Sequence, residues 1–299
     1  MEEKKKSNKG LICLVVILLL AVLGLVGYIL VDKGVIKLKK ETKPEAKVEA
    51  RDIELDVESD EVVSLMNRAL AVDNYEIVST VHSNFAVFKD GFDINKVSGE
   101  DFEFLVSEYL KTKVNDYSGI KEVTVDGKNS DLYSTLKIET FKFYALDYFG
   151  PSYEFETKET NGSLRSSCGI YRYSEADGCY VSFFGCGGVY LDRYINKLDK
   201  AVKTSEGTIV ITLSNLVLVN DPDNNGNNFL RNSVDSAENI TYYKNDENVE
   251  LMHGEEFSDA TKNKIDEIFK IYNDKAAKYQ FTFKKDGDNY YINKVTRLS

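Results

Sequence analysis

The stretch KYQFTFKKDGDNYYINKVTRL, residues 278–298, places two β-rich runs on either side of a turn at Lys285-Asp286-Gly287-Asp288. Aromatic and β-branched residues are frequent in both runs, and the turn holds the Asp-Gly pair that is typical of tight hairpins. The segment therefore predicts an antiparallel hairpin near the end of the sequence. The stretch 207–219, GTIVITLSNLVLV, is as strongly β. The preceding stretch 191–203 fits either an amphipathic helix or a hairpin partner for it.

Helices are predicted where apolar residues recur at three- and four-residue spacing. They run from Val62 to Leu70, from Phe102 to Leu110, over about 136–149 and over about 258–277. The third of these ends at Gly150 and Pro151, because neither residue continues a helix readily.

Residues 75–90 have the composition of a second hairpin. Helices and antiparallel strands in mixed order, without βαβ alternation, indicate an α+β fold with helices packed on a curved antiparallel sheet. This body is expected over residues 59–299 and can divide into two subdomains, 59–150 and 151–299.

The N-terminal region reads as a membrane anchor. Residues 11–31, LICLVVILLLAVLGLVGYILV, hold no charge and are long enough for a transmembrane helix. A cleaved signal peptide is the competing interpretation, but bulky residues follow where a small-residue cleavage site would be expected. Residues 1–10 form a short basic tail, and residues 32–58 read as a charged, solvated stalk. Four lysines lie on each side of the span, so the positive-inside rule does not set its orientation. The very short N-terminal tail favours a cytoplasmic N-terminus and an extracytoplasmic body.

The charge of the chain is unevenly distributed. The formal net charge is −11, and residues 41–299 carry −16 because residues 1–40 carry +5. A protein that binds a polyanion needs a basic face. The acidic body therefore argues against a nucleic-acid partner.

Residues 168–188, CGIYRYSEADGCYVSFFGCGG, hold three of the four cysteines. A loop over 174–178 joins two strand-like runs and places Cys168 opposite Phe184, one diagonal away from Cys186. A turn tighter by one residue per strand places Cys168 directly opposite Cys186. We therefore predict a Cys168–Cys186 disulfide, which requires an oxidising compartment, and a free thiol at Cys179. A zinc site or a Cys-x-x-Cys redox centre fits less well, because the spacings are 11 and 7 residues.

One segment resembles the start of a calcium-binding loop. Asp221, Asp223 and Asn225 supply oxygen ligands at alternate positions, and Gly226 follows them. Position 12 would be Asn232, where a bidentate glutamate is expected. A polar turn after a strand is therefore the competing interpretation.

The sequence contains no nucleophile elbow, phosphate loop or dinucleotide-binding fingerprint. We therefore predict no catalytic residue and no cofactor. The leading expectation is a binding or scaffold module whose partners are the lipid bilayer, through residues 11–31, and an unidentified protein or envelope ligand. The alternatives are an envelope hydrolase that uses carboxylates or Cys179, and a transmembrane sensor.

Several features together resemble a group of single-pass, membrane-anchored surface proteins of Gram-positive bacteria. They are the basic N-terminus, the single anchor, the charged stalk, the Cys-Gly-Gly at Cys186 and the Tyr-x-Phe-x-Phe-Lys-Lys-Asp-Gly run from Tyr279 to Gly287. The group is uncharacterised, so the resemblance implies a surface location and an α+β body but no activity.

Overall fold

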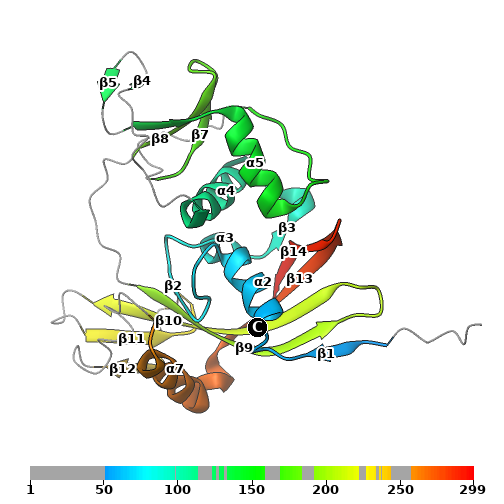
Figure 1. Cartoon of the computed structure of the whole chain (residues 1–299). Helices are drawn as coiled ribbons and strands as arrows, with labels where there is room; N and C mark the ends of the chain where they lie inside the picture. Colours follow the sequence, from blue (N-terminus) through cyan, green and yellow to red (C-terminus); the bar gives the residue numbers. More distant parts are fainter. Residues whose placement is uncertain are drawn as a thin grey trace, which may run out of the picture. The chain divides into compact units, whose positions relative to one another are not determined.

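The computed structural model describes residues 51–97, 99–113, 123–125, 128–130, 133–158, 169–183, 192–221, 227–233, 236, 238–243 and 257–299. These residues form a mixed α+β fold of helices and antiparallel sheets (Figure 1). The α-helices in this part of the chain are α2 (Asp60–Leu70), α3 (Phe85–Phe88), α4 (Gly99–Lys113), α5 (Ile138–Phe149) and α7 (Asp259–Tyr272). Two short 3₁₀ helices, η1 (Ile94–Lys96) and η5 (Asn273–Lys275), are also present.

The large sheet has nine strands, some of which precede residue 150 in the sequence and some of which follow it. Its main path runs through β1 (Ile53–Leu55), β9 (Arg193–Lys203), β10 (Ile209–Asp221), β13 (Ala277–Asp286), β14 (Asn289–Arg297) and β3 (Phe92–Asp93). Off this path lie β2 (Ile77–Ser79) on β9, and β11 (Asn227–Arg231) with β12 (Thr241–Tyr243) beside β10. All of these pairings are antiparallel.

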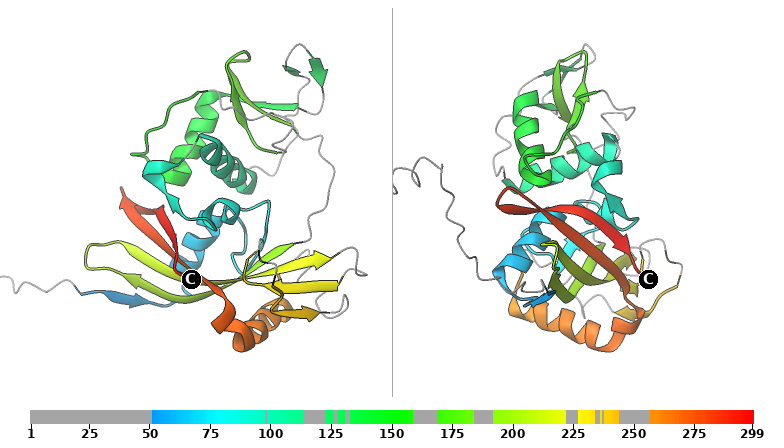
Figure 2. Two further views of the ribbon diagram at one scale, coloured as in Figure 1. Left: turned by 180° about the vertical axis from the view of Figure 1, so that it is seen from behind. Right: turned by 90° about the vertical axis from the view of Figure 1, so that its right-hand side faces the viewer.

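A second sheet has three antiparallel strands, in the order β6 (Tyr133–Leu136), β8 (Cys179–Phe183) and β7 (Arg172–Ser174). A separate pair joins β4 (Val123–Val125) to β5 (Lys128–Ser130). Figures 1 and 2 show α7 on one face of the large sheet and α2 with α3 on the other. The helices α4 and α5 lie beyond α2 and α3, next to the small sheet, and the β13–β14 hairpin rises toward them.

Strand periodicity explains how the large sheet is covered on both faces. Along β10, Ile211 and Leu213 belong to the main core, whereas Leu216 and Leu218 pack in a second cluster with residues of α7. Successive strand residues point to opposite faces, so a strand buried on both sides reads as a nearly continuous apolar run. In β13, every second residue from Tyr279 to Phe283 is buried and faces the main core.

The structure confirms the terminal hairpin and the first three predicted helices in outline. Within the ambiguous stretch 191–203, Arg193–Lys203 forms the strand β9, which pairs with β10 over most of its length. The fourth predicted helix is too long: α7 ends at Tyr272, and Ala277 already begins β13. The loop between β7 and β8 is also one residue shorter than predicted, because Ser174 pairs with Cys179.

The prediction of a hairpin over residues 75–90 is wrong. Only β2 is a strand there, and α3 takes the place of the second strand. The reason is burial: Phe85 and Phe88 are fully buried in the main core, and one helical turn sends both inward. Residues 53–55, which the sequence assigns to the stalk, form β1. This strand lies at an edge of the large sheet and pairs with β9.

Among the described residues, no helix is both long and apolar enough to cross a membrane. The predicted tail (1–10), anchor (11–31) and first part of the stalk lie outside the described residues. They stay predictions.

Candidate functional site

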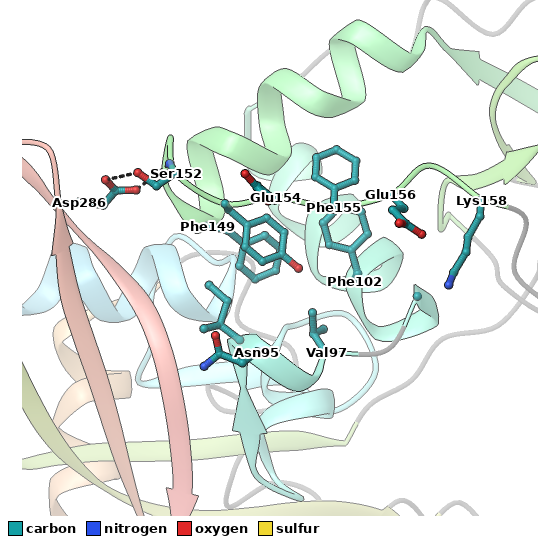
Figure 3. A pocket seen from close by; sticks show the side chains of 13 residues that line it. Asn95, Val97, Phe102, Phe149, Ser152, Glu154, Phe155, Glu156, Lys158 and Asp286 are labelled. Carbon is teal, nitrogen blue, oxygen red and sulfur yellow. Dashed lines mark hydrogen bonds between the residues drawn. The ribbon is translucent and has the colours of Figure 1, made fainter.

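The described residues form a groove of about 630 Å³. On one side lie η1 and the residues after it, with Ile94, Asn95 and Val97 (Figure 3). On the other side lie α4, the end of α5 and residues 151–158, which we call the strap. The volume falls within the range of small-ligand sites in proteins.

Four aromatic side chains build one wall of the groove: Phe102 from α4, Phe149 from α5, and Tyr153 and Phe155 from the strap. The ring centroids are 4.6 Å apart for Phe149 and Tyr153 and 4.6 Å apart for Phe102 and Phe155. These are separations of rings in direct contact. The rings therefore leave no gap between the members of each pair, and the wall presents only its outer surface to the groove.

Within the strap, residues 152–156 alternate between exposed and half-buried. Tyr153 and Phe155 are half-buried, whereas Glu154 and Glu156 are exposed. This period of two is typical of extended chain. Burial raises the pKa of Tyr153 to about 12, so its hydroxyl stays neutral at physiological pH.

The start of the strap is fastened to the last residue of β13. The backbone N–H of Ser152 donates to Asp286 Oδ2 at 2.8 Å, and Ser152 Oγ donates to Asp286 Oδ1 at 2.9 Å (Figure 3). Gly150, at φ +110°, permits this close approach: a Cβ there would lie 2.8 Å from Asp286 Oδ2. These bonds close one end of the groove.

The rim of the groove is acidic. Its charged residues are Glu154, Glu156, Asp286 and Lys158, which leaves a net charge of −2. The site thus combines an apolar aromatic wall with a negative border.

Buried polar contacts hold α4 and α5 in place behind the wall. Asn84 Nδ2, before α3, donates to Tyr148 Oη at 2.8 Å and approaches the carbonyl oxygens of Ala69 and Leu105 at 3.3 Å each. The Tyr148 hydroxyl donates in turn to Ala69 O at 2.6 Å. One group of hydrogen bonds therefore joins α2, which holds Ala69, to α4 and α5.

A second polar cluster lies elsewhere, where β9, β10 and β13 meet η5. Ser214 Oγ is 2.6 Å from Asp199 Oδ2, and Lys278 Nζ is 2.9 Å from the same oxygen and also contacts Ser214. A serine beside a lysine can form a catalytic pair, but only when the amine is neutral. Here Lys278 is ion-paired with Asp199, and Ser214 is fully buried. Asn273 Oδ1 of η5 accepts from both Ser214 Oγ and Lys278 Nζ at 3.0 Å, so the cluster fastens η5 to the sheet.

Of the predicted site residues, Cys179 is described, at the start of β8. It is a half-buried free thiol, and burial, together with the nearby Asp177 carboxylate, raises its pKa. A thiol nucleophile requires the opposite shift. This environment disfavours Cys179 as a catalytic group.

We expect Cys179 to be alkylated more slowly at pH 8 in the folded chain than in the urea-unfolded chain. The thiolate is the reactive form, and a raised pKa lowers its fraction at that pH. The rate against pH should reach its midpoint above that of the unfolded chain, and Asp177→Asn should lower the midpoint. Peptide-resolved mass spectrometry after timed iodoacetamide treatment measures this, and equal midpoints in both states would contradict it.

The remaining predicted site residues are not tested by the structure. Cys168, Cys186, Asp223 and Asn225 lie outside the described residues, and of Asp221 only the backbone, at the end of β10, is described. Within the described ranges no group of three or more metal-ligating side chains gathers. The disulfide and the calcium loop stay predictions.

No motif in the sequence indicates the groove. The one local signal was the alternation of aromatic and acidic residues at 153–156, Tyr-Glu-Phe-Glu. The other wall comes from η1, and one end comes from Asp286. Comparison of the chain with protein-family models, with curated proteins and with solved structures finds no match.

Proposed function

We propose that this protein is a membrane-anchored binding module, with residues 11–31 in the bilayer, the N-terminus in the cytoplasm and the body outside. The aromatic-walled groove is its ligand site. The observation that carries the proposal is the combination of a ligand-sized hollow, four clustered aromatic rings and a charged rim. Ligand pockets are commonly lined by apolar and aromatic groups with a few polar groups that orient the ligand.

The chemistry of the groove favours binding over catalysis. Ser152 is its one described hydroxyl side chain beside Tyr153, and it donates to a carboxylate that also accepts the Ser152 backbone N–H. A nucleophile needs a base that frees its proton. Asp286, already engaged by two donors, instead secures the groove.

Site-specific photocrosslinking in the cell of origin tests this proposal. A photoreactive phenylalanine analogue at Tyr153, in the groove, is expected to give a discrete adduct. The same analogue at Tyr242, which is 45% exposed on β12, is expected to give none. Val97→Trp, which fills the groove from its other wall, should diminish the adduct at Tyr153.

Equal adducts at both positions, or none at either, would argue against a groove-centred binding function. Protease added to intact cells tests the orientation in the same strains. Release of the body supports the proposed topology, and complete protection contradicts it.

A further inference from the structure

We infer that the groove binds an extended peptide segment that carries basic side chains alternating with apolar ones. This inference rests on the proposed function and names the chemistry of the ligand. The strap acts as the strand to which the peptide pairs. Its carboxylates meet the basic side chains, and the aromatic wall meets the apolar ones.

The second part of the strap has no backbone partner in the part of the chain that the structure describes. From Glu154 to Lys158 it makes no hydrogen bond to the backbone of any other described residue. Side chains of an extended chain project to its two faces, so its N–H and C=O groups point to its edges. Extended backbone of this kind is what an incoming peptide strand uses for β-addition.

The dimensions of the groove suit an extended chain. Its lining follows the strap from Ser152 to Lys158, six residue steps that span roughly 20 Å at the rise of a β-strand. Figure 3 shows the strap along one side of the groove and Asn95 with Val97 on the other. A long hollow bounded by a strand-like segment matches a short peptide better than a compact molecule.

Charge selects the kind of peptide. Three carboxylates and one amine line the groove, and Glu154 and Glu156 point to the exposed face of the strap two residues apart. Alternate side chains of a paired strand have the same spacing. Lysine or arginine at every second position of the ligand therefore lies within reach of these carboxylates.

A tryptophan reporter makes the test direct, because the chain contains no Trp. The full chain in detergent, with Tyr153→Trp, is titrated with capped Lys-Val-Lys-Val-Lys, with capped Glu-Val-Glu-Val-Glu, and with the lysine peptide N-methylated at alternate amides. The lysine peptide is expected to give a saturable shift of the emission. The glutamate peptide is expected to give none. N-methylation should weaken binding roughly tenfold or more, because it removes backbone donors.

Matched variants assign the charge effect. Glu154→Gln with Glu156→Gln should weaken binding of the lysine peptide roughly three- to tenfold, as expected for two partly solvated ion pairs. The same change at Glu54 and Glu206, which are exposed and outside the groove lining, should leave it unchanged. A Tyr242→Trp reporter should show no shift.

The alternatives have distinct outcomes. Binding of spermidine equal to that of the lysine peptide, with no effect of N-methylation, would overturn the inference in favour of charge alone. A shift with a neutral oligosaccharide but not with the lysine peptide would overturn it and leave the proposed binding function standing. If neither peptide nor sugar shifts the reporter and the crosslinking test also fails, both proposals are wrong.

Discussion

Replacing Arg172 with methionine is expected to lower the free energy of unfolding by about 3–5 kcal/mol, because the buried carboxylate of Glu103 then loses the guanidinium that pairs with it. The side chains of Glu103 and Arg172 are only 3% and 11% exposed, and Arg172 Nη1 lies 3.1 Å from Glu103 Oε2. The backbone N–H of Tyr173 donates to the other carboxylate oxygen at 2.9 Å. This contact ties β7 to α4, the helix that contributes Phe102 to the groove. Urea unfolding of the full chain in detergent measures the change.

Two controls separate burial from simple loss of an ion pair. Glu103→Leu combined with Arg172→Met removes both charges and should recover much of the lost stability. Lys197→Met breaks the exposed ion pair between Lys197 and Asp266, whose side chains are 42% and 51% exposed respectively. This change should lower the free energy of unfolding by at most about 1 kcal/mol. If Arg172→Met costs no more than Lys197→Met, the pair does not stabilise the junction of α4 with the small sheet.

Replacing Phe85 with alanine is expected to cost about 3–5 kcal/mol, the range for deleting a buried phenylalanine ring. Phe85 is fully buried, and its ring centroid lies 4.6 Å from that of Tyr194 and 5.0 Å from that of Tyr279. It therefore joins the short helix α3 to strands β9 and β13. Thermal unfolding followed by circular dichroism gives the effect.

The matched control is Phe143→Ala on α5. Phe143 is 64% exposed, so its deletion should change stability by no more than about 0.5 kcal/mol. Equal effects of the two substitutions would mean that α3 does not insert Phe85 into the core. In that case the hairpin predicted from the sequence for residues 75–90 would describe this segment better than α3 does.

The candidate site was far less predictable than the secondary structure. Its walls come from η1 and the residues just after it, from α4, from the end of α5, from the strap and from Asp286, which are brought together only by packing. Aromatic residues in the strap predict burial of some kind, but they do not say that a hollow remains beside them. The partner of Ser152 lies 134 positions away, so no local pattern could name it.

Local spacing in the sequence determined the amphipathic helices, the terminal hairpin and the apolar segment 11–31, because each depends on residues that are neighbours along the chain. Only the tertiary structure decided the segments with two local solutions. Residues 193–203 become a strand because β10 offers them hydrogen-bond partners, and residues 85–88 become a helix because the core receives Phe85 and Phe88. The groove belongs to the same class, since its shape is the space left between elements distant in sequence. Long-range pairing and packing supply the free energy that selects among locally equivalent conformations.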